Sequence, residues 1–207
     1  MLEKLLELRD RTLWRILDAS GPAVYYITDH KAEGILVNTP GFDEPLLARL
    51  QAISPLKYIF LPSHRGARDL DLWRTASGAE SISSEPEAAL IEGHVDITLD
   101  SKRNKLTRTI DFLPMSGVTV GTCALRLKNK PGVMFFGPAL EPGDDGWPTL
   151  VPHAEDYSAE NRLFGSLGVQ DLAFEYAFTD VFEPGHTRYG PGASEMIKAA
   201  LARFLDE

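Results

Sequence analysis

The chain has 207 residues, of which 43% are hydrophobic and 25% are charged, and its formal net charge is −9 at pH 7. An acidic chain without a basic face binds nucleic acid poorly, so we expect no nucleic-acid partner. The single cysteine excludes an internal disulfide and a zinc cluster built from several cysteines. No apolar run approaches the ~18 residues of a membrane span, and the start, MLEKLLELRD, lacks the continuous apolar segment of a signal peptide. We therefore expect a cytoplasmic protein with a single α/β domain over residues 1–207.

In the first half of the chain, apolar spacing and turn residues predict alternating helices and strands. Leucine and isoleucine recur at helical spacing near the start, which predicts a helix over 2–18 within an N-terminal helical extension, 1–20. Strands are then predicted over 23–27, 34–37, 58–61 and 80–83, and helices over 44–53, 67–75 and 85–91.

Beyond Gly93 the pattern changes to short strands separated by turns. Strands are predicted over 96–99, 107–113, 122–127 and 133–136, and helices over 159–167 and 194–205. Residues 171–179 fit either a strand or a helix. A long loop rich in Pro, Gly and Asp covers 138–158, and we expect its acidic pairs, at 144–145 and 155–156, to be solvated.

Four short segments lie where predicted strands end or loops begin. In chain order they are 61–69 (LPSHRGARD), 116–122 (SGVTVGT), 135–138 (FFGP) and 184–187 (PGHT), preceded by the strand end GILVNTPG at 34–41. Their order resembles the metallo-β-lactamase superfamily over residues 23–205, where the corresponding segments read THxHxDH, GHTPGS, GD and GHG. The resemblance implies an αβ/βα four-layer sandwich of two mixed sheets, with helices on both outer faces and a site where loops leave the strands.

The same resemblance implies which residues stand at the metal-ligand positions. In active members, imidazoles and carboxylates hold two metal ions that lower the pKa of a bridging water toward ~7. This chain keeps His64 and His186, and it has Asp69 where the motif has its last histidine. The remaining positions carry neither an imidazole nor a carboxylate: Asn38, Gly66, Arg68, Val118 and Pro138.

A catalytic zinc site needs about three protein ligands and an open position. The guanidinium of Arg68 stays charged at physiological pH and repels a cation. The pattern therefore predicts a metallo-β-lactamase-fold protein that has lost its dinuclear metal centre, needs no cofactor and is non-hydrolytic. The alternative is a residual mononuclear hydrolase that uses His64, Asp69 and His186. A third interpretation is a protein-interaction module, such as a homodimer in which the N-terminal segment pairs with a second chain.

The vacated pocket has two interpretations. A guanidinium can replace the charge of an ion, and its fork suits carboxylate or phosphate oxygens, so His64, Arg68 and His186 would line a site for a small anionic ligand. In the other interpretation His64 is a hydrogen-bonded remnant at a strand end, and Arg68 forms an internal salt bridge with Asp69 or Asp71.

Overall fold

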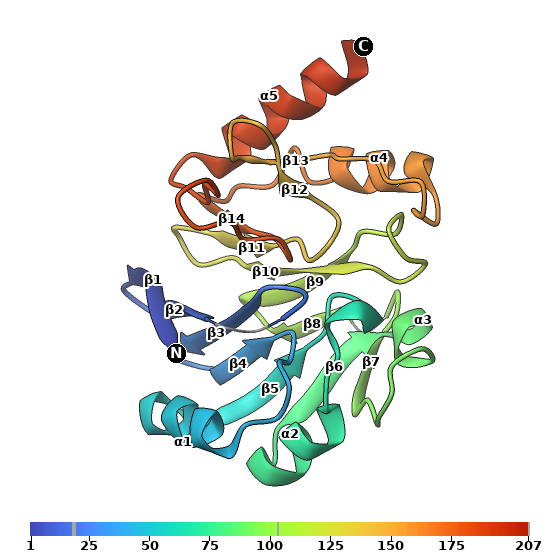
Figure 1. Cartoon of the computed structure of the whole chain (residues 1–207). Coiled ribbons are helices and arrows are strands. Elements are labelled where there is room, and N and C mark those ends of the chain that lie inside the picture. The colour runs from blue at the N-terminus through green and yellow to red at the C-terminus, as the bar shows by residue number, and fades with distance from the viewer. Residues whose placement is uncertain (18–19, 103, 207) are drawn as a thin grey trace. The chain divides into compact units, whose positions relative to one another are not determined.

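The computed structural model describes residues 1–17, 20–102 and 104–206, which belong to two compact units, Met1–Asp100 and Ser101–Glu207 (Figure 1). Each unit has its own mixed β-sheet and its own hydrophobic core. The predicted α/β fold with two mixed sheets is therefore confirmed. That the two units make up a single domain stays a prediction.

Within the described residues, the first unit contains a seven-stranded sheet in the order β1-β2-β3-β4-β5-β6-β7. Neighbouring strands are antiparallel from β1 to β4 and parallel from β4 to β7. The strands are β1 (Leu2–Leu8), β2 (Arg11–Ile16), β3 (Val24–Asp29), β4 (Glu33–Val37), β5 (Leu56–Phe60), β6 (Glu80–Ser84) and β7 (Ile97–Leu99). The helices are α1 (Glu44–Ile53), the 3₁₀ helix η1 (His64–Gly66), α2 (Leu70–Ser77) and α3 (Glu85–Ala88).

Helices α1 and α2 pack on one face of this sheet through their apolar stripes. Leu50 of α1 and Trp73 of α2 are buried in one cluster with Tyr26 and Leu36 from the strands. The indole N–H of Trp73 donates to the carbonyl of Pro40 at 2.9 Å, so the polar group of this buried ring is satisfied. The segment 61–69 therefore runs from a buried strand to a helix that is firmly packed into the core.

The helix predicted over 2–18 is wrong: residues 2–17 contain the strands β1 and β2, and residues 18–19 of the predicted extension lie outside the described residues. Strand β2 pairs with β3 along its whole length, from Arg11 opposite Asp29 to Ile16 opposite Val24. This pairing satisfies the backbone of β2, whose β-branched and aromatic residues favour a strand. The leucines that suggested a helix belong largely to β1, the edge strand of the sheet.

In the second unit, the described residues contain a five-stranded sheet in the order β14-β11-β10-β9-β8, antiparallel except for β11 and β14. The strands are β8 (Lys105–Thr107), β9 (Ile110–Pro114), β10 (Cys123–Leu127), β11 (Val133–Phe135) and β14 (Tyr176–Phe178). The long loop contains a small hairpin, β12 (Glu141–Pro142) and β13 (Pro148–Thr149). The helices are α4 (Ala159–Leu167) and α5 (Ala193–Asp206).

The sheet of the second unit packs against residues of α4 and α5, since Leu163, Ile197 and Leu201 share one apolar cluster with Met134 and Phe136. The strand predicted over 107–113 is instead a pair of strands, because a turn at 108–109 separates β8 from β9. The ambiguous segment 171–179 contains the strand β14. No helix in the described part of the chain has the length and apolar character needed to cross a membrane.

Asp96, just before β7, ties α2 to β6. Its carboxylate accepts hydrogen bonds from the guanidinium of Arg74 at 2.7 and 2.5 Å, and from the backbone N–H and hydroxyl of Ser81 at 2.8 and 2.7 Å. The hydrogen bonds from Arg74, with those from Ser81, hold the pKa of Asp96 well below its ordinary value, although partial burial opposes this shift. Ionised Asp96 therefore stabilises the folded first unit.

We expect Asp96→Asn to lower the free energy of unfolding at pH 7 by about 2 kcal/mol, because an ionised acceptor of several hydrogen bonds is lost. A carboxyl group whose pKa is depressed by folding stabilises the fold above its unfolded pKa, ~4, and loses that contribution as the pH falls below it. The difference between wild type and variant should therefore shrink from about pH 5 toward pH 2. Urea unfolding across this range measures it, and the exposed Asp144→Asn is the control. Equal losses in the two variants would contradict the role of Asp96.

Candidate functional site

His64 begins η1, and its side chain is 33% exposed. Its partner is the fully buried Glu87 of α3. One carboxylate oxygen of Glu87, Oε2, lies 2.7 Å from the backbone nitrogen of His64 and 2.7 Å from the ring atom Nδ1. A carboxylate oxygen only accepts hydrogen bonds, so Nδ1 carries the proton, and Nε2 of the neutral ring keeps its lone pair. Glu87 thus sets both the position and the tautomer of His64.

Gly66 packs directly against Asn38. A Cβ atom at position 66 would overlap Oδ1 of Asn38 and lie 2.6 Å from its Cγ. Asn38 is itself held in place, because it is buried and its amide nitrogen donates to the carbonyl of Ala23 at 2.8 Å. The carbonyl of Gly66 accepts the backbone N–H of Thr39 at 2.9 Å. Position 66 therefore has no room for a side chain while Asn38 and its backbone keep these positions.

Arg68 directs its side chain toward the loop before β3. Its guanidinium donates to Oγ of Ser20 at 2.5 Å and lies beside Gly21. Its backbone N–H donates to Oγ1 of Thr39 at 2.7 Å. The expected salt bridge to Asp69 or Asp71 does not occur among the described contacts, because Arg68 binds Ser20 instead.

The acidic neighbours of Arg68 have partners of their own. Oδ2 of Asp69 accepts the backbone N–H of Phe42 at 2.9 Å, and Asp71 pairs with Arg74 at 3.0 Å. An open cavity of about 530 Å³ lies beside these residues. Its charged lining residues are Arg68, Asp69, Asp71 and Glu92. With three carboxylates for one guanidinium, this lining does not attract an anion.

His186 belongs to the second unit and lies in the turn after Pro184 and Gly185. Its Nε2 lies 2.9 Å from the carbonyl oxygen of Gly143 in the long loop. A carbonyl oxygen only accepts, so Nε2 carries the proton and has no lone pair to offer a cation. A Cβ at Gly146 would overlap the carbonyl of His186, so the turn and the loop are closely packed.

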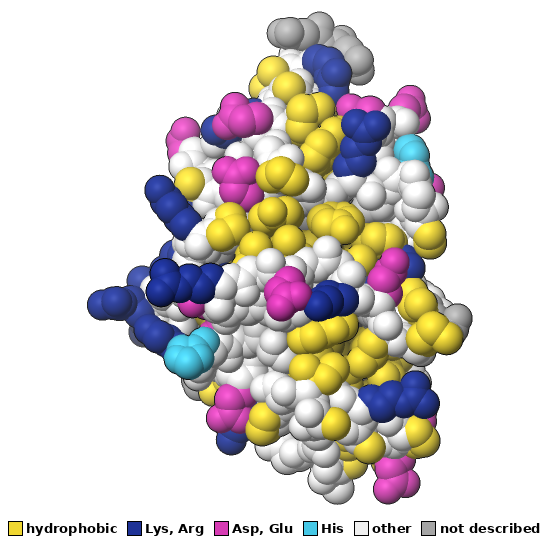
Figure 2. Space-filling model, turned by 90° about the vertical axis from the view of Figure 1, so that its left-hand side faces the viewer, with side chains coloured by type: hydrophobic (Ala, Val, Ile, Leu, Met, Phe, Trp, Pro, Cys, Tyr) yellow, Lys and Arg dark blue, Asp and Glu magenta, His cyan; other side chains and the backbone are white. Residues whose placement is uncertain are grey.

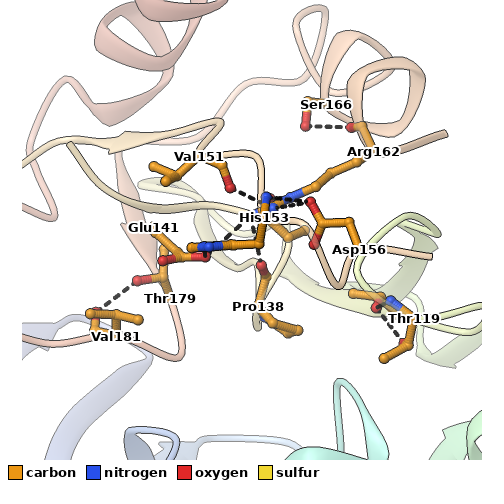
Figure 3. A network of polar contacts seen from close by, with 12 residues as sticks. Thr119, Pro138, Glu141, Val151, His153, Asp156, Arg162, Ser166, Thr179 and Val181 are labelled. Atoms are coloured by element: carbon orange, nitrogen blue, oxygen red, sulfur yellow. Dashed lines mark hydrogen bonds and ion pairs between the residues drawn. The ribbon is translucent and has the colours of Figure 1, made fainter. Parts of the chain in front are cut away.

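Arg162 of α4 brings a buried positive charge to the long loop (Figure 3). Its side chain is only 1% exposed. The guanidinium donates to the carbonyls of Ala139 at 3.0 Å, Val151 at 2.6 Å and Pro138 at 3.3 Å. Pro138 follows Gly137 at the position where the motif resemblance expects a bridging aspartate, and in this chain its carbonyl faces a guanidinium.

Two carboxylates balance the charge of Arg162. Asp156 lies 2.7 Å from the guanidinium, and Glu141 lies 3.3 Å from it and 2.7 Å from Nε2 of His153 (Figure 3). Burial alone would raise the pKa of Asp156, but hydrogen bonds from the backbone of His153 and from Arg162 outweigh burial and lower it. The expectation of a solvated acid is therefore wrong for Asp156, whose side chain is 2% exposed.

Solved structures of metallo-β-lactamases match the chain over nearly its whole length. One from Pontibacter korlensis has a TM-score of 0.71 and 15% sequence identity, and covers 100% of this chain and 98% of that one. The chain has the metallo-β-lactamase fold. The DIM-1 metallo-β-lactamase has a TM-score of 0.71 and 14% identity over 98% of both chains. BJP-1, a subclass B3 metallo-β-lactamase of Bradyrhizobium japonicum, has a TM-score of 0.62 and 14% identity, and the match covers 97% of this chain and 91% of that one. No protein-family model and no curated protein matches the sequence.

The metallo-β-lactamase fold does not bring the predicted alternative ligands together within one unit. His64 and Asp69 belong to the first unit and His186 to the second. Neither unit, in the part of the chain that the structure describes, groups three or more His, Cys, Asp or Glu side chains so that they could hold a metal ion. Val118, at another ligand position, is buried.

Sequence patterns missed Glu87 and Arg162. Glu87 follows Glu85 in the acidic first turn of a short helix, and no pattern separates its buried carboxylate from that exposed neighbour. Arg162 offered a signal, because it lies one helical turn before Ser166 on the face that α4 buries. An arginine on a buried helix face indicates carboxylate or carbonyl partners.

We expect Gly66→Ala to destabilise the fold by about 2–4 kcal/mol, since its methyl group overlaps Asn38. Asn38→Gly removes that side chain and tolerates the φ of 61° found there. The double variant should therefore exceed the stability that additivity predicts by at least about 1 kcal/mol. Urea unfolding of the four proteins gives this coupling energy, and additive energies would contradict the steric argument. The control is Gly168→Ala, where an added Cβ meets nothing closer than 3.4 Å.

Arg162→Met should lower the free energy of unfolding by about 3–5 kcal/mol, because it leaves Asp156 buried without its cation. The matched control is Arg203→Met on α5, where the arginine is 68% exposed and a change within about 0.5 kcal/mol is expected. Urea unfolding measures both. Similar losses in the two variants would show that the buried network contributes little.

Proposed function

We propose that this chain is a metallo-β-lactamase-fold protein that has lost the dinuclear metal centre, so that it is a pseudoenzyme with respect to metal-dependent hydrolysis, or a binding protein. The observation that supports this most strongly is the packing of Asn38 against Gly66. A second motif histidine would need its side chain in the space that Asn38 fills.

The residues at the other positions where the resemblance expects metal ligands also support the loss of the metal centre. Arg68 carries a permanent positive charge, and the carbonyl of Pro138 already accepts a hydrogen bond from Arg162. Nε2 of His186 carries a proton that it donates to Gly143. In His64 it is Nε2, and in His186 it is Nδ1, that keeps the lone pair of the neutral ring. These side chains do not fit a pair of metal ions, and we assign no hydrolytic step to one.

The contacts of Arg68 favour a structural role over an anion site. Its guanidinium is engaged by Ser20, and the adjoining cavity is predominantly acidic. The charge of a protonated His64 would already be balanced by Glu87. The face in Figure 2 carries charges of both signs, with hydrophobic side chains between them.

The protein purified without added metal should contain well below one equivalent of zinc, iron or manganese, and its melting temperature should be the same with and without EDTA. The reason is that a catalytic zinc site needs about three protein ligands, and the described residues contain no group of three His, Cys, Asp or Glu side chains that could hold a metal ion. Elemental analysis and thermal melting measure this, with the exposed His94→Ala as control. About one metal per chain, lost in His64→Ala or His186→Ala, would support the mononuclear hydrolase that uses His64, Asp69 and His186.

Phosphate should leave the melting temperature of the wild type unchanged, and Arg68→Ala should lower it equally with and without phosphate, because the hydrogen bond to Ser20 is lost. Thermal melting over a phosphate titration tests this, with the exposed Arg49→Ala on α1 as control. A saturable rise that Arg68→Ala abolishes would instead support the anion site of His64, Arg68 and His186.

A further inference from the structure

His64 retains a reactive atom for which the proposed loss of the metal centre leaves no role. Its Nδ1 proton is donated to Glu87, so the lone pair of Nε2 remains on the other side of the ring. Among the described residues, no hydrogen bond engages Nε2. The side chain is 33% exposed while Glu87 is fully buried, so a small molecule can reach the ring but not its partner.

Two hydrogen bonds, not one, hold the carboxylate of Glu87 against His64. Oε2 of Glu87 accepts the backbone N–H of His64 as well as its ring N–H, both at 2.7 Å. Such lengths are those of hydrogen bonds to an ionised acceptor. A buried carboxylate that fixes the tautomer of an imidazole and stabilises its cationic form is an arrangement that activates the opposite nitrogen.

We propose that His64 and Glu87 form a metal-independent acyl-transfer site for small carboxylic esters, with Nε2 of His64 as nucleophile and Glu87 as positioning residue. Nε2 attacks the ester carbonyl carbon, the bond to the alcohol oxygen breaks, and the alcohol leaves as its anion. The acylated ring keeps its Nδ1 proton, and Glu87 balances its positive charge. Water then attacks the acyl carbon, Nε2 leaves with its electron pair, and the carboxylic acid releases its proton to solvent.

Exposure alone would favour a different histidine. The side chain of His94 is 69% exposed, about twice as much as that of His64, and its Nε2 lies 3.7 Å from Asp96. In His186 and His153 the atom Nε2 already contacts Gly143 and Glu141. The proposal therefore predicts that His64 reacts faster than His94, whereas accessibility predicts the reverse order.

The first experiment uses the wild-type protein in EDTA. Diethyl pyrocarbonate, which acylates neutral imidazoles, is added at about pH 8, where an ordinary histidine of pKa ~6.5 is neutral, and mass spectrometry gives the rate at each histidine. We expect His64 to react faster than His94. A rate at His64 equal to or below that at His94 would overturn the proposal without needing any variant to fold.

The second experiment measures p-nitrophenolate release from p-nitrophenyl acetate in EDTA. We expect His64→Ala and His64→Gln to fall to the background rate, and the control His94→Ala to match the wild type. Glu87→Gln should be at least about tenfold slower. Unchanged release in the His64 variants would overturn the proposal. Activity that EDTA abolishes would overturn it too, and would also argue against the proposed loss of the metal. Metal-free protein without acyl transfer would leave the proposed function standing.

A spectroscopic measurement separates positioning from mere stabilisation by Glu87. The ¹⁵N shifts of the neutral His64 ring should report a protonated Nδ1 and an unprotonated Nε2 in the wild type. In folded Glu87→Gln the two tautomers should mix, since the charged acceptor is lost. A wild-type ring protonated at Nε2 would overturn the proposal.

Discussion

The second unit depends on the guanidinium of Arg162, because the long loop 138–158 closes around it. A loop of this length normally leaves many backbone carbonyls for water to satisfy. Here three carbonyls and two carboxylates turn inward toward one planar cation. Arginine suits this position because its five donors diverge in a fixed plane and it is weakly hydrated. The loop then supports the turn of His186, which contacts it at Gly143 and Gly146.

In the first unit, too, polar side chains have hydrogen-bond partners within the protein, but the partners differ. Polar side chains at the ends of its strands have partners supplied by the chain itself: a buried carboxylate for His64, a backbone carbonyl for Asn38 and a hydroxyl for Arg68. A neutral amide at position 38 needs no counter-charge, unlike the carboxylate that the motif resemblance expects there. Each of these side chains thus makes a hydrogen bond within the first unit.

Local sequence patterns predicted the bounds of those elements whose own residues mark a buried face and a boundary. The helices over 44–53 and 159–167 have the predicted bounds, since each combines an apolar stripe with an N-terminal boundary that the sequence shows. The hairpin of β1 and β2 could not be predicted in this way, because its leucines suit a helix equally well and only pairing with β3 decides.

The motif resemblance located His64, Arg68 and His186 but not what surrounds them. Glu87 lies 23 residues from His64, and Ser20 lies 48 residues from Arg68, so both contacts arise from tertiary packing that no short motif records. The same holds for the buried charge of Asp156, which composition alone assigns to solvent. The sequence thus predicts where the strands end better than it predicts which residues contact the side chains there.

The contact between Gly66 and Asn38 also limits which pairs of residues the two positions can hold together. Aspartate has the same shape as asparagine, so exchanging one for the other at position 38 would not make room for an imidazole at position 66. An imidazole at position 66 therefore requires the backbone of 38 or 66 to move, whichever of these two residues stands at position 38. The packing of one side chain thus fixes which residue its neighbour can be.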